Sequence, residues 1–297
     1  MKEENNNKDP HDRHPMLEQL SQLWKNKPAI AGLIIIVTFI LAAIFAPWIS
    51  PHDPLEVSLY DQIKPPVWHE TGAWKNILGT DDLGRDTLSR IIWGSRVSLQ
   101  VALFAVGLAF AIGTFLGAVA GYFKGKLDSA IMRIMDMILA FPYLLLAIVV
   151  VAYLGPSLEN AMMAIAITYV PRFARIVRGS VLEEAEKDYV MAEHALGAKN
   201  RRIIFLAILP NCLGPLIVLT TLSMASAILD SAALSFLGLG AQPPIPEWGA
   251  MIARSRGLIL RASWVMTFPG VAILLAVLGF NLFGDGLRDA LDPRLRD

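Results

Sequence analysis

The chain has 297 residues, of which 55% are hydrophobic and 18% are charged, and its formal net charge is zero. A mean hydropathy of +0.50 with continuous apolar runs is typical of a membrane protein and excludes an ordinary soluble domain of this length. The balanced charge gives no indication of a nucleic-acid partner. The single cysteine, Cys212, excludes an internal disulfide and a thiolate metal cluster.

A polar N-terminal tail, residues 1–28, precedes the first apolar segment. A membrane-spanning helix needs ~20 mostly apolar residues. Six segments are long enough, although Asn160, Pro171 and Arg172 interrupt the fourth: residues 29–49, 97–122, 130–154, 158–177, 211–237 and 262–283. The first is long for a signal peptide and no convincing cleavage site follows it, so we interpret it as an uncleaved span. The sequence therefore predicts an all-α integral membrane protein with six transmembrane helices.

The positive charges predict the orientation of these spans. With the N-terminus inside, cytoplasmic segments hold 18 of the 26 Lys and Arg residues, and external segments hold 8. Because basic residues accumulate on the cytoplasmic side, both termini are expected in the cytoplasm. The loop between the fourth and fifth spans is the richest in positive charge, which places it on the cytoplasmic face.

The second predicted span carries a stripe of small residues. Ala105, Ala109, Gly113, Gly117 and Gly121 recur at every fourth position and so lie on one helical face. Small residues with this spacing allow another helix to approach closely. We expect this face to contact protein and not lipid.

Two acidic residues lie well inside predicted spans and away from their first turns, where an ionised carboxylate costs ~2.5–3.5 kcal/mol. Asp136 has Arg133 three residues before it, so these two side chains can form an ion pair on one helical face. Asp230 has no cation nearby in the sequence. Either acid can serve packing or line a translocation pathway, and the sequence leaves both interpretations open.

The sequence contains none of the motifs expected of an enzyme. There is no G-x-x-x-x-G-K-[ST] loop to hold nucleotide phosphates, and neither H-E-x-x-H nor G-x-S-x-G occurs. Asp81, Asp82 and Asp86 form an acidic group before the second span. Because Arg85 and Arg90 lie among them, we interpret this group as a solvated surface of mutually paired charges and not as a metal site.

The stretch EKDYVMAEHALGAKNRRIIFLAILPN, which begins at Glu186, lies in the positively charged loop. Tyr189, Ala192 and Leu196 share one face of a predicted helix. Gly197 stands where a helix ends in a left-handed residue, and Asn200 is expected to cap a second helix that returns to the membrane. Such an element can dock on a cytoplasmic protein, or it can lie on lipid headgroups, and periodicity alone does not decide between them.

The same stretch resembles the cytoplasmic coupling loop of binding-protein-dependent ABC importer permeases, which is marked by E-A-A, three residues, Gly, nine residues and I-x-L-P. Gly197 matches the glycine, and A-I-L-P from Ala207 to Pro210 occupies the last position with Ala in place of Ile. The E-A-A positions hold Met191, Ala192 and Glu193, so only the middle residue matches.

The resemblance extends over nearly the whole chain. The segments LGTDDLGRDTLSRIIWGSR and RIMDMILAFP resemble signatures of the dipeptide, oligopeptide and nickel branch of this family. The segments AQPPIPEWG and NLFGDGLRDALDP are most similar to the C-type permease of dipeptide transporters. This resemblance implies the type I ABC importer permease fold in a bacterial cytoplasmic membrane.

The resemblance also implies a division of the chain. Residues 1–28 and 285–297 would be cytoplasmic tails. Residues 29–96 would form the first span with an external segment. Residues 97–284 would form a five-helix permease core, with the coupling loop at residues 178–210.

The partners implied are a B-type permease subunit, two ABC ATPase subunits that bind ATP and Mg, a periplasmic or extracellular peptide-binding protein, and membrane lipid. This chain itself would hold no cofactor and perform no bond chemistry. The residues implied to contact an ATPase are Tyr189, Ala192, Glu193, Leu196, Gly197, Leu209 and Pro210. Dipeptides are the expected substrate, with oligopeptides, antimicrobial peptides, haem and nickel chelates as alternatives.

Two other classes of protein remain as alternatives. An ion-coupled secondary transporter would use Asp136 and Asp230 as coupling sites and would need no docking helix. A membrane-embedded enzyme would need a catalytic group of residues at one depth, and the sequence offers none.

Overall fold

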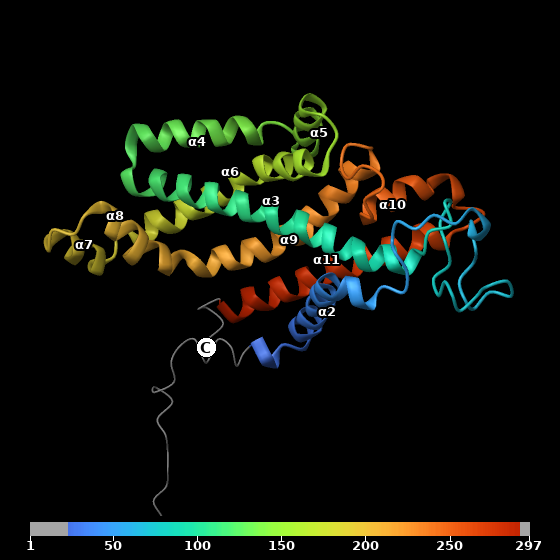
Figure 1. Cartoon of the computed structure of the whole chain (residues 1–297). Coiled ribbons are helices and arrows are strands. Elements are labelled where there is room, and N and C mark those ends of the chain that lie inside the picture. Colours follow the sequence, from blue (N-terminus) through green and yellow to red (C-terminus); the bar gives the residue numbers. More distant parts are fainter. Residues whose placement is uncertain (1–22, 292–297) are drawn as a thin grey trace, which may run out of the picture.

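The computed structural model describes residues 23–291 and is built from helices (Figure 1). The predictions for residues 1–22 and 292–297 lie outside the described residues. The elements in chain order are α2 (Lys27–Ile49), η2 (Leu59–Asp61), α3 (Thr87–Phe123), α4 (Gly125–Leu139), α5 (Tyr143–Leu154), α6 (Leu158–Glu184), α7 (Asp188–Ala195), α8 (Asn200–Arg202), η3 (Ile203–Ile208), η4 (Leu209–Cys212), α9 (Leu213–Phe236), α10 (Trp248–Ser255), η5 (Arg256–Leu258) and α11 (Trp264–Leu291).

Four helical stretches of the described chain are long and apolar enough to cross a membrane: α2, α3, the continuous run Asn200–Phe236, and α11. The bent pair α4–α5 makes a fifth if it is counted as one span. Helix α11 continues to Leu291, so the start of the predicted C-terminal tail at residue 285 is helical. Figure 1 shows α7 and α8 at one end of the bundle, and α10 with the segment between α2 and α3 at the other.

The third predicted span, residues 130–154, is wrong as a single straight helix. The structure divides it into α4 and α5, whose axes differ by 88°. The break lies at Phe141 and Pro142, between the two helices. Because proline lacks a backbone donor and disfavours the helical conformation of the residue before it, the chain leaves α4 here and restarts at Tyr143.

The fourth predicted span continues past residue 177 to Glu184 as helix α6. Arg172, Arg175 and Arg178 therefore lie within a helix, although the sequence argument counted them among the loop charges. The remaining basic residues still favour the same orientation. Helix α6 is not among the four stretches that pass the apolar test, because polar and charged residues interrupt it.

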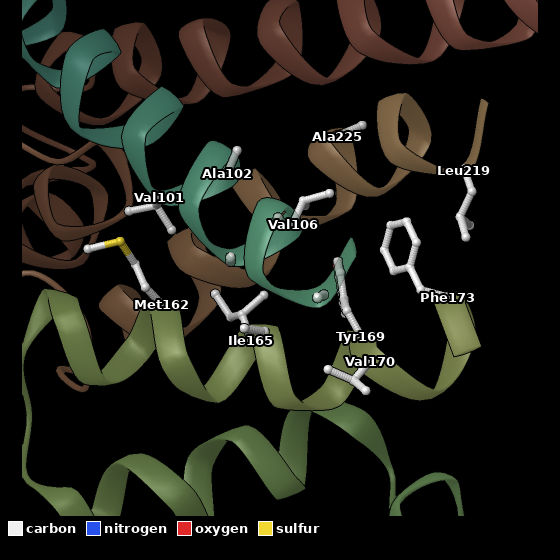
Figure 2. Close-up of a cluster of buried hydrophobic side chains, with 14 of the residues drawn as sticks. Val101, Ala102, Val106, Met162, Ile165, Tyr169, Val170, Phe173, Leu219 and Ala225 are labelled. Carbon is white, nitrogen blue, oxygen red and sulfur yellow. The ribbon is translucent and has the colours of Figure 1, made fainter. Parts of the chain in front are cut away.

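The buried core lies where α3, α6 and α9 meet (Figure 2). Val101 and Val106 come from α3, Ile165 and Phe173 from α6, and Leu219 from α9, and all are buried. The rings of Phe110 and Phe173 meet edge to face with centroids 6.0 Å apart. Buried aliphatic and aromatic side chains thus form the main contact between these three helices.

The small-residue stripe of α3 lies directly against the backbone of α6. A Cβ atom placed on Gly117 would lie 2.8 Å from the Cβ of Val177, and one on Gly121 would lie 2.9 Å from the carbonyl oxygen of Arg178. A Cβ on Gly113 would be 2.8 Å from the carbonyl oxygen of Val170. Real Cβ contacts are longer than this, so these positions admit only glycine while the backbones stay in place. The stripe is thus a contact within one chain.

Helix α2 also packs closely on α11 through glycine residues. A Cβ on Gly32 would lie 2.6 Å from the carbonyl oxygen of Gly279 and 2.7 Å from the amide nitrogen of Phe283. The side chain of Asn26 caps the start of α2 by accepting a hydrogen bond from the amide of Ala29 at 3.1 Å. The N-terminal span is therefore attached along the outside of the last span.

Asp81 and Asp86 of the acidic group before α3 are buried, and only Asp82 is exposed, so the interpretation of the group as a solvated surface is wrong for these two. Asp81 and Arg85 are joined by a side-chain hydrogen bond of 2.7 Å, and the guanidinium of Arg90 donates to the carbonyl of Pro54 at 3.0 Å. Asp86 caps α3 by accepting from the amide of Ser89 at 2.8 Å. All four charged groups are at most 5% exposed. The pairing of these charges was expected from the sequence. Their burial was not expected, because residues 51–86, which cover them, were treated as an exposed loop.

We expect Gly117→Leu to destabilise the subunit, because the larger side chain must separate α3 from α6 and overpacking typically costs ~1–3 kcal/mol. The midpoint of thermal aggregation of the detergent-purified chain measures the effect. Gly107→Leu is the matched control on the same helix, since a Cβ there meets no atom within 4 Å. Equal midpoints for the two variants would contradict the packing described here.

Candidate functional site

The loop between α6 and η3 is an ordered hairpin of two short helices. Helix α7 ends in a Schellman motif, in which the amide of Ala198 donates to the carbonyl of Glu193 and the amide of Gly197 donates to that of His194, both at 3.0 Å. Gly197 has φ of +75°, the left-handed conformation that the sequence pattern predicts. A Cβ at Gly197 would meet no atom within 4 Å, so the constraint at this position comes from the backbone alone.

Tyr189 fastens this hairpin to the ends of two long helices. Its hydroxyl donates to Oε1 of Glu184 at the end of α6 (2.8 Å) and accepts from Nδ2 of Asn211 in η4 (3.2 Å). Lys187 pairs with the other oxygen of Glu184 at 2.6 Å, and Val190 is fully buried beneath the loop. Burial and the Glu184 carboxylate raise the pKa of Tyr189 to about 12. The phenol therefore stays protonated and able to donate at any physiological pH.

The hairpin exposes apolar side chains among its polar ones. Leu196 is 86% exposed and Met191 is 56% exposed, with exposed Ala192 on the same short helix. Tyr189 is 36% exposed because its polar end is engaged inside the chain. Two large apolar side chains at the tip of a loop, far from the hydrophobic core, form a surface suited to contact another protein.

The remaining predicted loop residues have structural partners within the chain. Glu193 is half-buried and lies 3.6 Å from Arg202. Leu209 and Pro210 begin η4, where Leu209 is half-buried and Pro210 is exposed. The prediction that Asn200 caps the second helix is wrong, because Lys199 occupies the N-cap and the amide oxygen of Asn200 accepts from the hydroxyl of Tyr122 on α3 at 3.1 Å.

Sequence reasoning missed several residues that hold the loop in place: Tyr122, Glu184, Val190, His194 and Asn211. The ring of His194 stacks on Tyr122, with centroids 6.1 Å apart. These contacts join segments distant in the chain, and no spacing in the sequence indicates them. Only the buried Val190, between exposed neighbours on an apparently polar helix, gave a local signal.

A second group of polar residues lies between α5, α6 and α9. Asp230, which is 8% exposed, accepts a hydrogen bond from the hydroxyl of Tyr169 at 2.7 Å. The structure therefore gives Asp230 a packing partner. The same carboxylate also borders a cavity of about 530 Å³, with Tyr143, Arg172 and Ser226 among its other lining residues. Both interpretations of Asp230 thus have a structural counterpart.

Asp136 is paired across helices and not along its own. Its carboxylate accepts from Nη2 of Arg175 on α6 at 2.5 Å, so the predicted pairing with Arg133 is wrong. About two turns earlier on the same face of α4, Asp128 binds Arg178 through two hydrogen bonds of 2.5 and 2.6 Å. These pairs border a second cavity of about 540 Å³. Sequence proximity suggested Arg133 as the partner of Asp136, because the sequence does not show that α6 packs against α4.

Within residues 23–291, no group of three His, Cys, Asp or Glu side chains is arranged to hold a metal ion. The α7 hairpin exposes apolar side chains, and the two cavities beside α6 are bordered by charged side chains.

Comparison with known proteins identifies the family. Residues 113–297 match the family described as "Binding-protein-dependent transport system inner membrane component". Residues 15–66 match the "N-terminal TM domain of oligopeptide transport permease C". The chain belongs to the family of binding-protein-dependent transport permeases and is a multi-pass membrane protein.

The chain is similar over nearly its full length to three permeases with related names. It is 51% identical to the "Dipeptide transport system permease protein DppC" of Alkalihalophilus pseudofirmus, covering 100% of this chain and 97% of that one. It is 49% identical to the "Di/tripeptide transport system permease protein DppC" of Pseudomonas aeruginosa, covering 94% and 93%. Identity to the dipeptide permease of Escherichia coli is 50%, covering 93% and 94%.

Among solved structures, the fold is similar to a chain of the MetNI methionine ABC transporter in an inward-facing conformation. The TM-score is 0.58 at 20% sequence identity, covering 69% of this chain and 97% of that chain. This similarity establishes a type I ABC importer permease-like fold.

We expect Tyr189→Phe to loosen the α7 hairpin, because it removes hydrogen bonds to Glu184 and Asn211 that are worth ~1 kcal/mol each. Amide hydrogen exchange in Asp188–Ala195 should become faster by on the order of tenfold. Met191→Leu, an exposed change on the same helix, is the control and should leave the exchange rate unchanged. Unaltered exchange in Tyr189→Phe would show that other contacts hold the hairpin.

Proposed function

We propose that this chain is a membrane-spanning permease subunit of an ATP-driven importer of dipeptides. The observation that carries this proposal is the similarity, at about half of all positions and over the full length, to permeases named for dipeptide transport. The α7 hairpin supports it, since a rigid apolar tip at one end of the bundle is the element that such a subunit needs to receive force from an ATPase.

The complex would contain partners for each step of transport. A related B-type permease would form the other half of the pathway, and an external or periplasmic binding protein would deliver the peptide. Two ATPase subunits would bind ATP and Mg, because this sequence has no loop of the kind that holds nucleotide phosphates. This chain itself would then be a transport subunit without its own ATPase site.

The proposed topology has six spans, with α4–α5 and α6 added to the four apolar stretches, and both ends in the cytoplasm. The clustering of basic residues supports this orientation. The exposed Trp24 and Trp48, near the two ends of α2, support α2 as a span, since tryptophan is enriched where a helix meets the two membrane interfaces. The division of the chain into tails, an N-terminal unit of residues 29–96 and a core of residues 97–284 remains part of the proposal.

Movement of the ATPase subunits would be transmitted to the permease through the α7 hairpin. Leu196, Met191 and Ala192 would enter a groove on an ATPase subunit, with Gly197 setting the direction of the chain beyond them. Tyr189 would act from inside, because it ties the hairpin to both α6 and η4. Closure of the ATPase pair would move the hairpin as a rigid body and bias the permease between inward-facing and outward-facing states.

The alternatives differ in substrate and in energy source. The same fold could carry oligopeptides, antimicrobial peptides, haem or nickel chelates, and a transport assay with the isolated binding protein decides among these. An ion-coupled transporter is disfavoured by the pairing of Asp136 with Arg175, since an acid held in an ion pair is a poor site for a coupling ion. The apolar hairpin tip would also have no role in it.

The topology is tested by labelling single cysteines in a Cys212→Ser background. An impermeant thiol reagent added to intact spheroplasts should modify Gln62→Cys and Gln242→Cys, and should modify Lys199→Cys only after the membrane is opened. Residue 62 belongs to the segment between α2 and α3 and residue 242 to the segment just before α10, and Figure 1 shows the α2–α3 segment and α10 at the end of the bundle opposite the hairpin. Labelling of position 199 in intact spheroplasts would reverse the proposed orientation.

The coupling role is tested at Gly197, where a residue with a Cβ is disfavoured by ~1–2 kcal/mol because of the positive φ. In proteoliposomes with the whole importer, Gly197→Val should lose dipeptide uptake and ATP hydrolysis stimulated by the binding protein. Gly197→Asn should keep more of both, because asparagine tolerates the left-handed region.

Gly179→Ala is the control, since it also adds a methyl group where no atom lies within 4 Å, but in a helical conformation. Its uptake should equal that of the wild type. If Gly197→Val retained wild-type uptake, the hairpin would only connect α6 to α9 and would have no role in coupling.

A further inference from the structure

Three arginines project from one side of α6 at intervals of three residues: Arg172, Arg175 and Arg178. Arg175 is paired with Asp136 and Arg178 with Asp128, both on α4. Within residues 23–291, Arg172 forms no ion pair within 4 Å, although it is exposed beside the cavity of about 530 Å³. The two arginines nearer the α7 hairpin are thus neutralised inside the chain, and the third is left available.

An acid with available bonding capacity lies on the same cavity. Asp230 accepts from Tyr169 through Oδ2, and no ion pair of its carboxylate occurs in the described part of the chain. Tyr143 also lies beside this carboxylate. Arg172 and Asp230 do not approach each other within 4 Å. The cavity therefore presents one positive and one negative group that do not form an ion pair with each other.

Unpaired charges within a membrane-spanning helix are expensive. A fold that had only to pack α6 against its neighbours would pair Arg172 as it pairs Arg175 and Arg178. A ligand with two opposite charges can satisfy both groups at once. The cavity volume falls within the ~300–1,000 Å³ typical of sites for small molecules.

We propose that this cavity is a binding site for the two charged ends of a dipeptide during translocation. Arg172 receives the C-terminal carboxylate, and Asp230, held in position by Tyr169, receives the N-terminal ammonium. The charged termini of an extended dipeptide are ~7 Å apart. This separation suits two charged groups on α6 and α9 that do not contact each other. Arg172 and Asp230 contact only the termini of the peptide and not its side chains. The site therefore selects for free termini and short length. The inference rests on the proposed function.

The test uses the complete importer, reconstituted with its partner subunits and binding protein. Arg172→Gln should lower the maximal rate of alanyl-alanine uptake by about tenfold or more, since a charge-assisted contact is lost. Arg172→Lys should recover part of the rate, because lysine keeps the charge without the planar guanidinium. Arg261→Gln, which removes one exposed charge outside the cavity, is the control and should transport as the wild type does.

A second measurement separates binding from folding. Alanyl-photoleucine, a dipeptide with a photoreactive side chain, should label α6 or α9 in the wild type and label Arg172→Gln at least about tenfold less. The corresponding C-terminal amide, which lacks the carboxylate, should label both proteins equally and weakly. Asp230→Asn should reduce labelling by the free dipeptide in the same way, and N-acetylation of the probe should abolish that difference.

Wild-type uptake and labelling by Arg172→Gln would overturn the inference while leaving the proposed function intact. Loss of co-purification with the partner permease in Arg172→Gln would also overturn it, by showing that Arg172 is paired at the subunit interface. Absence of dipeptide uptake by the wild-type importer would instead remove the proposed function, and this inference with it.

Discussion

The close approach of the α3 and α6 backbones is the contact on which the rest of the subunit depends. Glycines at positions 113, 117 and 121 let α6 lie against α3 without intervening side chains. This contact fixes the rotation of α6 about its axis. Once Ala174 and Val177 face α3, Arg172 and Arg175 must face the other way, towards α4, α5 and α9. A packing constraint among apolar residues therefore decides where the charged residues stand.

Helix α6 connects the two functional regions of the chain. Its last turn supplies Glu184, which anchors the hairpin through Tyr189, and its middle supplies the arginines beside the cavities. Asn211 brings the start of α9 to the same anchor, and α9 carries Asp230 further along. The hairpin is therefore tied to α6 and α9, two of the helices that border the cavity.

The sequence predicted those features that depend on local pattern. The apolar runs located most of the helices, the glycine spacing located a close helix contact, and Gly197 located a left-handed turn. The errors share one cause, which is contact between distant segments. Arg133 was chosen for Asp136 because it is near in sequence, whereas the true partner lies on α6. The α4–α5 bend had a local signal in Pro142, but the angle depends on the helices around it.

The π-helix η3, Ile203–Ile208, joins the hairpin to α9. A π turn contains one residue more than an α turn, and each α-helical residue corresponds to ~100° of rotation. The segment before η3 is therefore out of register with the segment after it. If the same residues were wound as a regular α-helix, the extra residue would turn the hairpin by roughly 100° about the axis that η3 shares with α9. The backbone conformation of this segment is thus more tightly constrained than its apolar composition suggests, and an improvement in helical regularity would misdirect the exposed tip.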